Sequence, residues 1–356
     1  MKTAPAEVRL DVLTGRQVIL VPGRAARPGA RHPDPLLTAE TDPFAEGAES
    51  ETPDECFAVR PESTCPNSPG WLLRVVPNRY PIAAPLNAPG AAPIDDVPTD
   101  DAASEAGHEF FPTANFTGRH EVVIECPDSR SRLLDLSSAE IQRIFMAWRE
   151  RSRALIGEGR YRTLAIYRNE GFSAGASLPH CHSQILAACR LSQLDQTRLE
   201  RAEVYRRLHQ RELLRDLLEA EEQFKRRLIT ASDRLTVVCP FAPRSAWHVR
   251  FVPRPPQAAF FDAAQNDVLE ELADIVPKVL RAIEASCGSE TPMNIALSQP
   301  PVDRPAAWSW MLELLPRITK QAGWELLTDE DTFPGRPETW AAAIRRELHI
   351  DSQSAS

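Results

Sequence analysis

The sequence lacks long apolar runs and an excess of positive charge, and each absence excludes a class of function. No stretch approaches the roughly 20 apolar residues that cross a bilayer. The formal net charge is -9, whereas general nucleic-acid binding requires a basic surface that meets the phosphates. We therefore expect no membrane association and no nucleic-acid partner.

The cysteines form neither a disulfide framework nor a CxxC metal pair. There are 7 of them, an odd number, scattered along the chain. The first residues, Met1 to Glu7, also lack the apolar core of a secretory signal. These features predict reduced thiols and a cytoplasmic location.

Small and polar residues are instead concentrated between positions 169 and 187. The stretch reads NEGFSAGASLPHCHSQILA, a composition that predicts a loop leading into a strand. Because side chains alternate on a strand, His180, His182 and Gln184 are expected on one face. A lone His-x-His pair would favour a structural role, but Gly175 and the neighbouring small residues let backbone N–H groups approach an anion. The stretch therefore indicates a phosphate-binding site.

This stretch resembles the active-site signature of the galactose-1-phosphate uridylyltransferase family, the nucleotidyltransferase branch of the histidine-triad superfamily. The resemblance covers nearly the whole chain, from about Val8 to Arg346. The positions that match the signature at the family's spacing are Asn169, Ser177, Pro179, His180, His182 and Gln184.

The resemblance implies nucleotidyl transfer through a covalent histidine. His182, at the family's nucleophile position, would attack the α-phosphorus of a nucleotide-sugar, and a neutral imidazole can do so without a separate base. Gln184 can donate its amide N–H to the α-phosphoryl oxygens, while Ser177 and the loop backbone near Gly175 can meet the leaving phosphate. Histidine-triad hydrolases carry another histidine at the position of Gln184, so the glutamine favours a transferase.

Further substrate contacts are implied by resemblance outside this stretch. Asn78 follows a strand similar to the one that binds the nucleoside in the family. Arg24 and Arg27 lie in a segment similar to a family Arg-x-x-Arg-Pro segment, whose arginines contact nucleotide phosphates, often across a dimer interface. We therefore expect a homodimer in which Asn78, Asn169, Arg24, Arg27 and His180 contribute to substrate binding.

The family's metal site is not retained in this sequence. Asp42 and Ala45 replace both cysteines of a Cys-Pro-Phe-Cys segment, and Ser129 replaces a further ligand. A neutral serine or alanine cannot hold zinc, so we expect no metal cofactor and a hydrogen-bonding role for His180. A second metal site of some relatives also lacks its histidines, at Ser298, Ser309 and Met311.

The order of the expected elements predicts an α+β fold built from two tandem histidine-triad-like units. A strand–strand–helix–strand–strand pattern occurs twice, and the two copies are expected to share one mostly antiparallel sheet with helices packed on it. We place the catalytic unit at 8–190 and the second unit at 191–346. The second unit lacks the catalytic motif, because the residues that match His180, His182 and Gln184 are Ser309, Met311 and Glu313.

The motif leaves the substrate open. The reading we favour is a UDP-glucose–hexose-1-phosphate uridylyltransferase of galactose metabolism, which moves a UMP group between a nucleotide-sugar and a sugar phosphate. An ADP-sugar or dinucleoside-tetraphosphate phosphorylase would use the same His182. A nucleotide-binding protein without turnover is the alternative outside enzymology.

Overall fold

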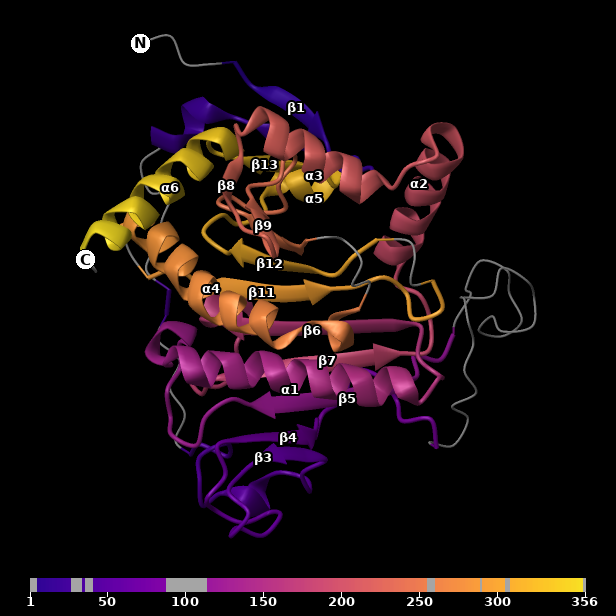
Figure 1. Ribbon diagram of the computed structural model, residues 1–356, viewed down its shortest axis with the longest axis vertical. Coiled ribbons are helices and arrows are strands. Elements are labelled where there is room, and N and C mark those ends of the chain that lie inside the picture. The colour runs from indigo at the N-terminus through magenta and orange to yellow at the C-terminus, as the bar shows by residue number, and fades with distance from the viewer. Residues whose placement is uncertain are drawn as a thin grey trace.

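The computed structural model describes residues 5–26, 34–35, 41–87, 114–254, 260–288, 290–304 and 308–354. Arg27 is therefore the one predicted site residue outside the described residues. A 10-stranded sheet runs through the centre of the molecule (Figure 1), and all its hydrogen-bonded neighbours are antiparallel. Its strands in chain order are β3 (Phe57–Val59), β4 (Leu73–Pro77), β5 (Gly118–Ile124), β6 (Thr163–Glu170), β7 (His182–Ala188), β8 (Leu228–Ala231), β9 (Leu235–Val238), β10 (Val249–Pro253), β11 (Met293–Ser298) and β12 (Met311–Pro316).

The strand order repeats on the two sides of the sheet's centre. From one edge it runs β3-β4-β5-β7-β6, and from the other edge it runs β8-β9-β10-β12-β11. The two halves meet where β6 pairs with β11, with Asn169 opposite Asn294. The predicted α+β fold of two tandem units in one antiparallel sheet is confirmed. The boundary placed between residues 190 and 191 falls after β7 and stays a prediction.

Two long helices cover one face of the sheet, α1 (Ser138–Gly157) and α4 (Asn266–Cys287), one from each half (Figure 1). A serine cap begins α1: the Ser137 side chain accepts the backbone N–H of Glu140, and the Glu140 side chain accepts the backbone N–H of Ser137. The buried sides of both helices pack on the sheet in one large apolar core. Among the described helices, none is long and apolar enough to cross a membrane.

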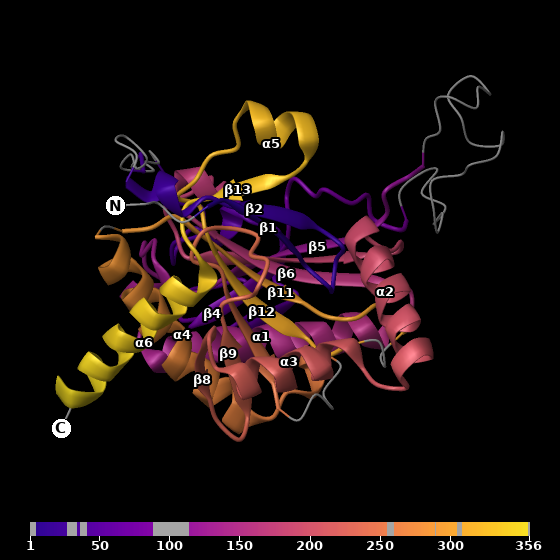
Figure 2. The ribbon, with the colours of Figure 1, turned by 90° about the horizontal axis from the view of Figure 1, so that it is seen from above.

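Smaller elements surround the rest of the sheet. A 3-stranded sheet and α5 project on the side away from α1 and α4 (Figure 2). The second half also carries α3, whose Leu214 and Leu218 pack against Val252 and Met311. The bounds of these elements are β1 (Glu7–Leu10), β2 (Gln17–Leu20), β13 (Asp331–Phe333), α2 (Gln193–His209), α3 (Leu213–Phe224), α5 (Gly323–Thr328) and α6 (Pro337–Ser354).

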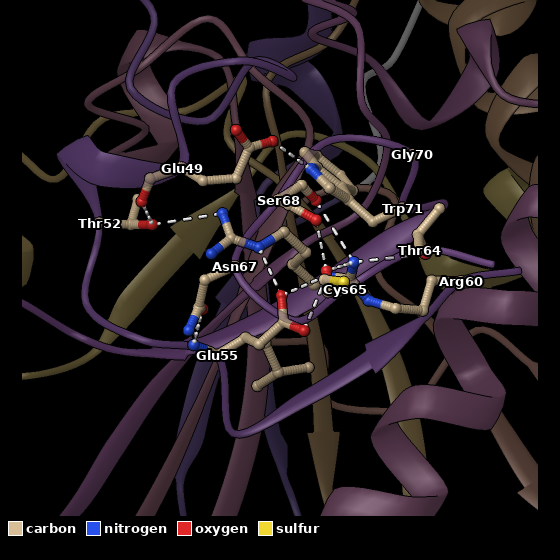
Figure 3. Close-up of polar contacts among 12 residues, drawn as sticks. Glu49, Thr52, Glu55, Arg60, Thr64, Cys65, Asn67, Ser68, Gly70 and Trp71 are labelled. Atoms are coloured by element: carbon tan, nitrogen blue, oxygen red, sulfur yellow. Dashed lines mark hydrogen bonds and ion pairs between the residues drawn. The ribbon is translucent and has the colours of Figure 1, made fainter. Parts of the chain in front are cut away.

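A polar network fixes the edge of the sheet in the first half, around the loop between β3 and β4 (Figure 3). Arg60 in this loop pairs with the Glu55 carboxylate at 2.6 Å and donates to the backbone carbonyl of Ser68. The Trp71 indole N–H donates to Glu49 Oε1 at 2.7 Å. Glu46 of the segment 42–47 accepts the backbone N–H of Gly70, so the network also holds that segment against the edge of the sheet.

Candidate active site

β7 begins at His182, directly after the small-residue loop, and lies between β5 and β6. His182 is opposite Ile124 of β5, and Gln184 is opposite Val122. Ser183, between them, points the other way, because its hydroxyl accepts the indole N–H of Trp148 on α1 at 2.8 Å. His182 and Gln184 therefore share the face turned away from α1, as strand alternation predicted.

The surroundings of His182 leave its imidazole neutral with one nitrogen available. Its Nδ1 lies 2.7 Å from the backbone carbonyl oxygen of His180. A carbonyl can only accept, so Nδ1 carries the proton and Nε2 carries the lone pair. Burial lowers the pKa of His182 to about 4, despite the hydrogen bond to that carbonyl. Neutral Nε2 is the state that a nucleophile requires at physiological pH.

Gln184 is held in one orientation by two neighbours. Its Oε1 accepts from the Tyr167 hydroxyl at 3.0 Å and from His120 Nε2 at 2.8 Å. The backbone N–H of Ile82 donates to His120 Nδ1 at 3.2 Å, which places the proton of a neutral His120 on Nε2. Burial also lowers the pKa of His120. With its oxygen occupied, Gln184 presents its NH₂ group as a donor.

The two predicted asparagines, Asn78 and Asn169, lie at different places around His182 and Gln184. Asn78 Nδ2 is 3.3 Å from His120 Nε2, so the end of β4 borders the Gln184 group. Asn169 Oδ1 accepts from Asn294 Nδ2 at 2.9 Å, and the same Asn294 amide donates to the Ala174 carbonyl at 2.8 Å. The second half of the chain therefore positions the loop that precedes β7 in the first half.

The loop before β7 has the conformation that its glycines allow. Gly171 and Gly175 both have φ of 86°, in the region that favours glycine. At Gly171 a Cβ atom would also approach an Asp34 carboxylate oxygen to 2.6 Å. A cavity of about 140 Å³ borders the loop, lined in part by Asn169, Ala176 and His180. Ser177 and Gly175 are exposed on the same loop, where a ligand can reach them.

Comparisons with known proteins agree on one family. Residues 94–191 match the sequence profile described as galactose-1-phosphate uridyl transferase, N-terminal domain. An ADP-glucose phosphorylase of Arabidopsis thaliana is 26% identical over 358 residues, 97% of this chain and 93% of that protein. The predicted resemblance to the galactose-1-phosphate uridylyltransferase family is confirmed.

Other relatives support the same assignment to the galactose-1-phosphate uridylyltransferase family. A crystal structure of an ADP-glucose phosphorylase from Arabidopsis thaliana with bound ADP-glucose has a TM-score of 0.76 to this chain at 26% identity, covering 96% of this chain and 99% of that one. A probable galactose-1-phosphate uridylyltransferase of Drosophila melanogaster is 27% identical over 237 residues, 65% of this chain and 61% of that protein. These similarities confirm the predicted nucleotidyltransferase assignment.

Where the resemblance implied a family metal site, this chain has a hydrogen-bonded cluster. His180 Nδ1 lies 2.8 Å from Asp42 Oδ2, and its Nε2 lies 2.8 Å from the Cys126 carbonyl oxygen. Ser129 donates its hydroxyl to the same Asp42 oxygen. Burial alone lowers the pKa of His180, but hydrogen bonds to Cys126 and Asp42 raise it to about 9. His180 is therefore an imidazolium at neutral pH.

Of the two arginines predicted to contact phosphates, the structure describes only Arg24. Arg27 lies outside the described residues. Arg24 is exposed at the end of a short 3-10 helix, Pro22–Ala26. The pKa of Glu325 on α5 is lowered mainly by the Thr332 hydroxyl and in part by the charge of Arg24, so Arg24 lies near α5. Within the described parts of this chain, no hydrogen bond or ion pair joins Arg24 to His182.

The sequence interpretation missed four contributors to the site: His120, Tyr167, Asn294 and Phe44. The Phe44 ring lies edge-on to the His182 ring, with centroids 5.3 Å apart. The internal repeat held a signal for His120, since it matches His248 in the second half and both histidines contact the polar residue of the neighbouring strand. Tyr167 and Asn294 come from β6 and β11, and only the pairing of these strands brings them to the site.

Proposed function

We propose that this protein transfers a nucleotidyl group from a nucleotide-sugar to a phosphorylated acceptor through a covalent intermediate on His182. The observation that carries the proposal is the hydrogen bond from His182 Nδ1 to the His180 carbonyl, at 2.7 Å. It fixes the tautomer and points an unprotonated nitrogen out of the strand. Nothing in this step needs a separate base, because the attacking nitrogen has no proton to lose.

The two half-reactions balance around one phosphorus atom. His182 Nε2 forms an N–P bond to the α-phosphorus, and the bond from that phosphorus to the bridging oxygen breaks. The electron pair leaves with the oxygen as a sugar 1-phosphate. In the second half-reaction an oxygen of the acceptor phosphate attacks, and the N–P bond returns its electrons to Nε2.

Gln184 stabilises the negative charge that develops on the α-phosphoryl oxygens by donating an amide N–H to them. Its NH₂ group is aimed by the bonds that His120 and Tyr167 make to its oxygen. A fixed donor of this kind lowers the barrier by about 2.7–4 kcal/mol in other enzymes. A neutral amide at position 184 also adds no further charge beside the His182 imidazole.

For the donor substrate, similarity over nearly the whole chain to an ADP-glucose phosphorylase favours ADP-glucose with inorganic phosphate as acceptor. A second candidate is UDP-glucose with a hexose 1-phosphate, as in galactose metabolism. The match of residues 94–191 to the uridylyltransferase domain and the shorter similarity to galactose-1-phosphate uridylyltransferases support it. Both reactions use the same histidine and the same glutamine.

The experiment that tests this function is intact-mass analysis of the purified protein. The chain is mixed separately with UDP-glucose, ADP-glucose and diadenosine tetraphosphate, without acceptor. We expect a gain of one nucleotidyl group per chain with one of them, whose mass identifies the base. Adding phosphate or a hexose 1-phosphate should remove the label and identify the acceptor. No label from any of the three donors would contradict the proposal.

We also propose a homodimer with a shared site, in a cytoplasmic location that stays a prediction. Trp324, Leu326 and Leu327 on α5 are 50%, 75% and 83% exposed in the single chain, near Arg24. Apolar side chains exposed together are typical of an interface. Sedimentation should show a dimer, and Arg24→Ala should weaken nucleotide-sugar use while the chain stays folded. A fully active monomer would exclude the shared site.

A further inference from the structure

The Asp42 carboxylate connects three separate segments beside the nucleophile. Its Oδ2 accepts from His180 Nδ1 at 2.8 Å and from the Ser129 hydroxyl. Its Oδ1 accepts the backbone N–H of Phe44 at 3.0 Å. One side chain thus joins the segment 42–47, the chain after β5, and the turn that leads into β7.

This donor set does not fit zinc, the metal that the family resemblance implies. Both ring nitrogens of His180 face oxygens that can only accept, Asp42 Oδ2 and the Cys126 carbonyl, so both carry protons. An imidazole protonated on both nitrogens has no lone pair for a metal. The remaining groups are the Asp42 carboxylate, the Ser129 hydroxyl and the Cys126 thiol, which lies 3.9 Å from His180 Nε2. Structural zinc takes four ligands, so this set is incomplete. Among the described residues, no group of three or more histidine, cysteine or acidic side chains could hold an ion.

Two contacts connect this cluster to His182. The His180 carbonyl accepts the Nδ1–H of His182, so the position of the His180 backbone sets the tautomer and the tilt of the nucleophile. The Phe44 ring packs edge-on against both histidine rings, with centroids 5.9 Å from His180 and 5.3 Å from His182. Asp42 holds His180 by its ring and Phe44 by its backbone, and so it fixes both neighbours of the nucleophile.

The segment 42–47 is also fixed at its far end. The backbone N–H of Glu46 donates to the Pro127 carbonyl at 2.8 Å, and Glu46 Oε1 accepts from the Gly70 N–H at 2.5 Å. Gly70 belongs to the edge network of Figure 3. The segment is therefore a strap with two anchors, of which Asp42 is the one beside the nucleophile.

We propose that Asp42 is a positioning residue: its carboxylate, paired with the imidazolium of His180, holds the strap over His182 in place of a structural metal. The proposal rests on the proposed function for its kinetic readout, but the geometry of the pair is independent of the substrate. It assigns Asp42 no contact with the reacting phosphate.

The kinetic test uses Asp42→Asn, which keeps the size of the side chain and removes its charge. We expect the single-turnover rate of His182 labelling to fall about 10- to 100-fold, as for other residues that orient a reactive group. The KM for the nucleotide-sugar should change far less, because Asp42 does not touch it. Asp42→Glu should recover part of the rate. The matched control is Asp267→Asn, which removes a carboxylate paired with exposed Arg234 on another part of the fold. It should leave the rate unchanged.

Two further readouts do not depend on turnover. In ¹⁵N NMR spectra of the wild-type chain, the His182 ring should show a protonated Nδ1 and an unprotonated Nε2, and Asp42→Asn should mix the two tautomers. Elemental analysis of the wild type should find far less than one zinc per chain. A stoichiometric zinc that Asp42→Asn releases would overturn the proposal, and so would an Asp42→Asn variant with the wild-type labelling rate and tautomer. If no nucleotide labels the wild type, the proposed function fails while the NMR result still decides the role of Asp42.

Discussion

The two halves of the sheet place different side chains on the same positions. In the first half Gln184 of β7 lies opposite Val122 of β5. In the second half Glu313 of β12 lies opposite Arg250 of β10. Each has a histidine partner from the start of the adjacent strand: His120 lies 2.8 Å from Gln184, and His248 lies 3.1 Å from Glu313. The strand pairing and the histidine partner are the same in the two halves, but Gln184 is a neutral amide and Glu313 is a carboxylate.

In the second half these positions stabilise the fold. Met311, which matches His182, is buried in an apolar cluster with Leu13 and Trp308 beneath α3. Glu313 is buried and pairs with Arg250 at 2.8 Å. Although burial raises the pKa of Glu313, the charges of Arg250 and His248 hold it well below the usual value.

In the first half, Gln184, His120 and His182 place no charged side chain at the proposed substrate site. Gln184 is neutral, and burial lowers the pKa of both His120 and His182, which favours the uncharged form of each imidazole. These side chains therefore add no negative charge that would repel the phosphates of the proposed substrate. The comparison teaches that function on this sheet depends on which side chains fill one face and on what covers that face. The strand order alone does not decide it.

The largest effect should come from His182→Gly, which removes the imidazole. Position 182 would then lack a nucleophile, as the matching position Met311 does. We expect labelling to fall more than about 1,000-fold, because no other group can form the N–P bond. Circular dichroism should show an unchanged fold, since His182 is not part of the apolar core that packs α1 and α4 on the sheet. A glycine variant that retains substantial labelling would show that the nucleophile is elsewhere.

The next largest effect should come from Gln184→Glu, which gives the first half the carboxylate of the second. A negative charge would replace the amide donor and repel the α-phosphoryl oxygens. We expect the single-turnover rate to fall about 100- to 1,000-fold. Gln184→Asn is the matched variant that keeps an amide, and it should be impaired less. Equal rates for the glutamate variant and the wild type would exclude a donor role for Gln184.

A smaller effect is expected from His120→Ala, since His120 orients Gln184 without contacting phosphorus. The single-turnover rate should fall about tenfold, as for other residues that orient a reactive group by hydrogen bonding. Tyr167→Phe removes the other bond to the Gln184 oxygen and should have a similar or smaller effect. The combined variant should lose less than the product of the two effects, because both act on one amide.

In the second half, Glu313→Gln should change stability and leave labelling unchanged. It leaves the buried charge of Arg250 without its partner, which costs about 3–5 kcal/mol in comparable sites. Urea denaturation measures the loss, and the rate per folded chain should equal that of the wild type. A variant with unchanged stability would show that the Arg250–Glu313 pair does not hold this half together.

The smallest effect is the expected absence of a pH response. A histidine with an ordinary pKa near ~6.5 would lose most of its nucleophilic form between pH 7.5 and about 5.5. Because burial lowers the pKa of His182 to about 4, the single-turnover rate should stay level over that interval. The same shift has a stability consequence of definite sign: the unfolded chain protonates His182 first, so its contribution to stability declines as pH falls from about 6.5 towards 4. A rate that falls with a midpoint near 6.5 would show that His182 is not shielded as the structure describes.

Local pattern was enough to predict much of this fold and part of the site. Alternation along 180–184 placed His182 and Gln184 on one face. The repeat predicted one sheet from two units. These features are local, or follow from a comparison of the chain with itself.

The remaining contacts depend on pairing between distant segments. The bond from His120 to Gln184 spans 64 positions in the sequence, and the one from Asn294 to Asn169 spans 125. The Asp42–His180 pair spans 138. The sequence showed that a cysteine was absent at position 42, but only the fold shows that the aspartate in its place meets His180. The covering of the second half by α3 likewise depends on the fold, which brings Leu214 and Leu218 against Val252 and Met311.

The most direct test of the account is the location of the nucleotidyl group on the labelled protein. The chain labelled in the mass experiment is digested at neutral pH, and the peptide that contains both His180 and His182 is fragmented in the mass spectrometer. The account predicts the group on His182, with His180 unmodified. A group found on His180, or on any residue outside β7, would contradict it.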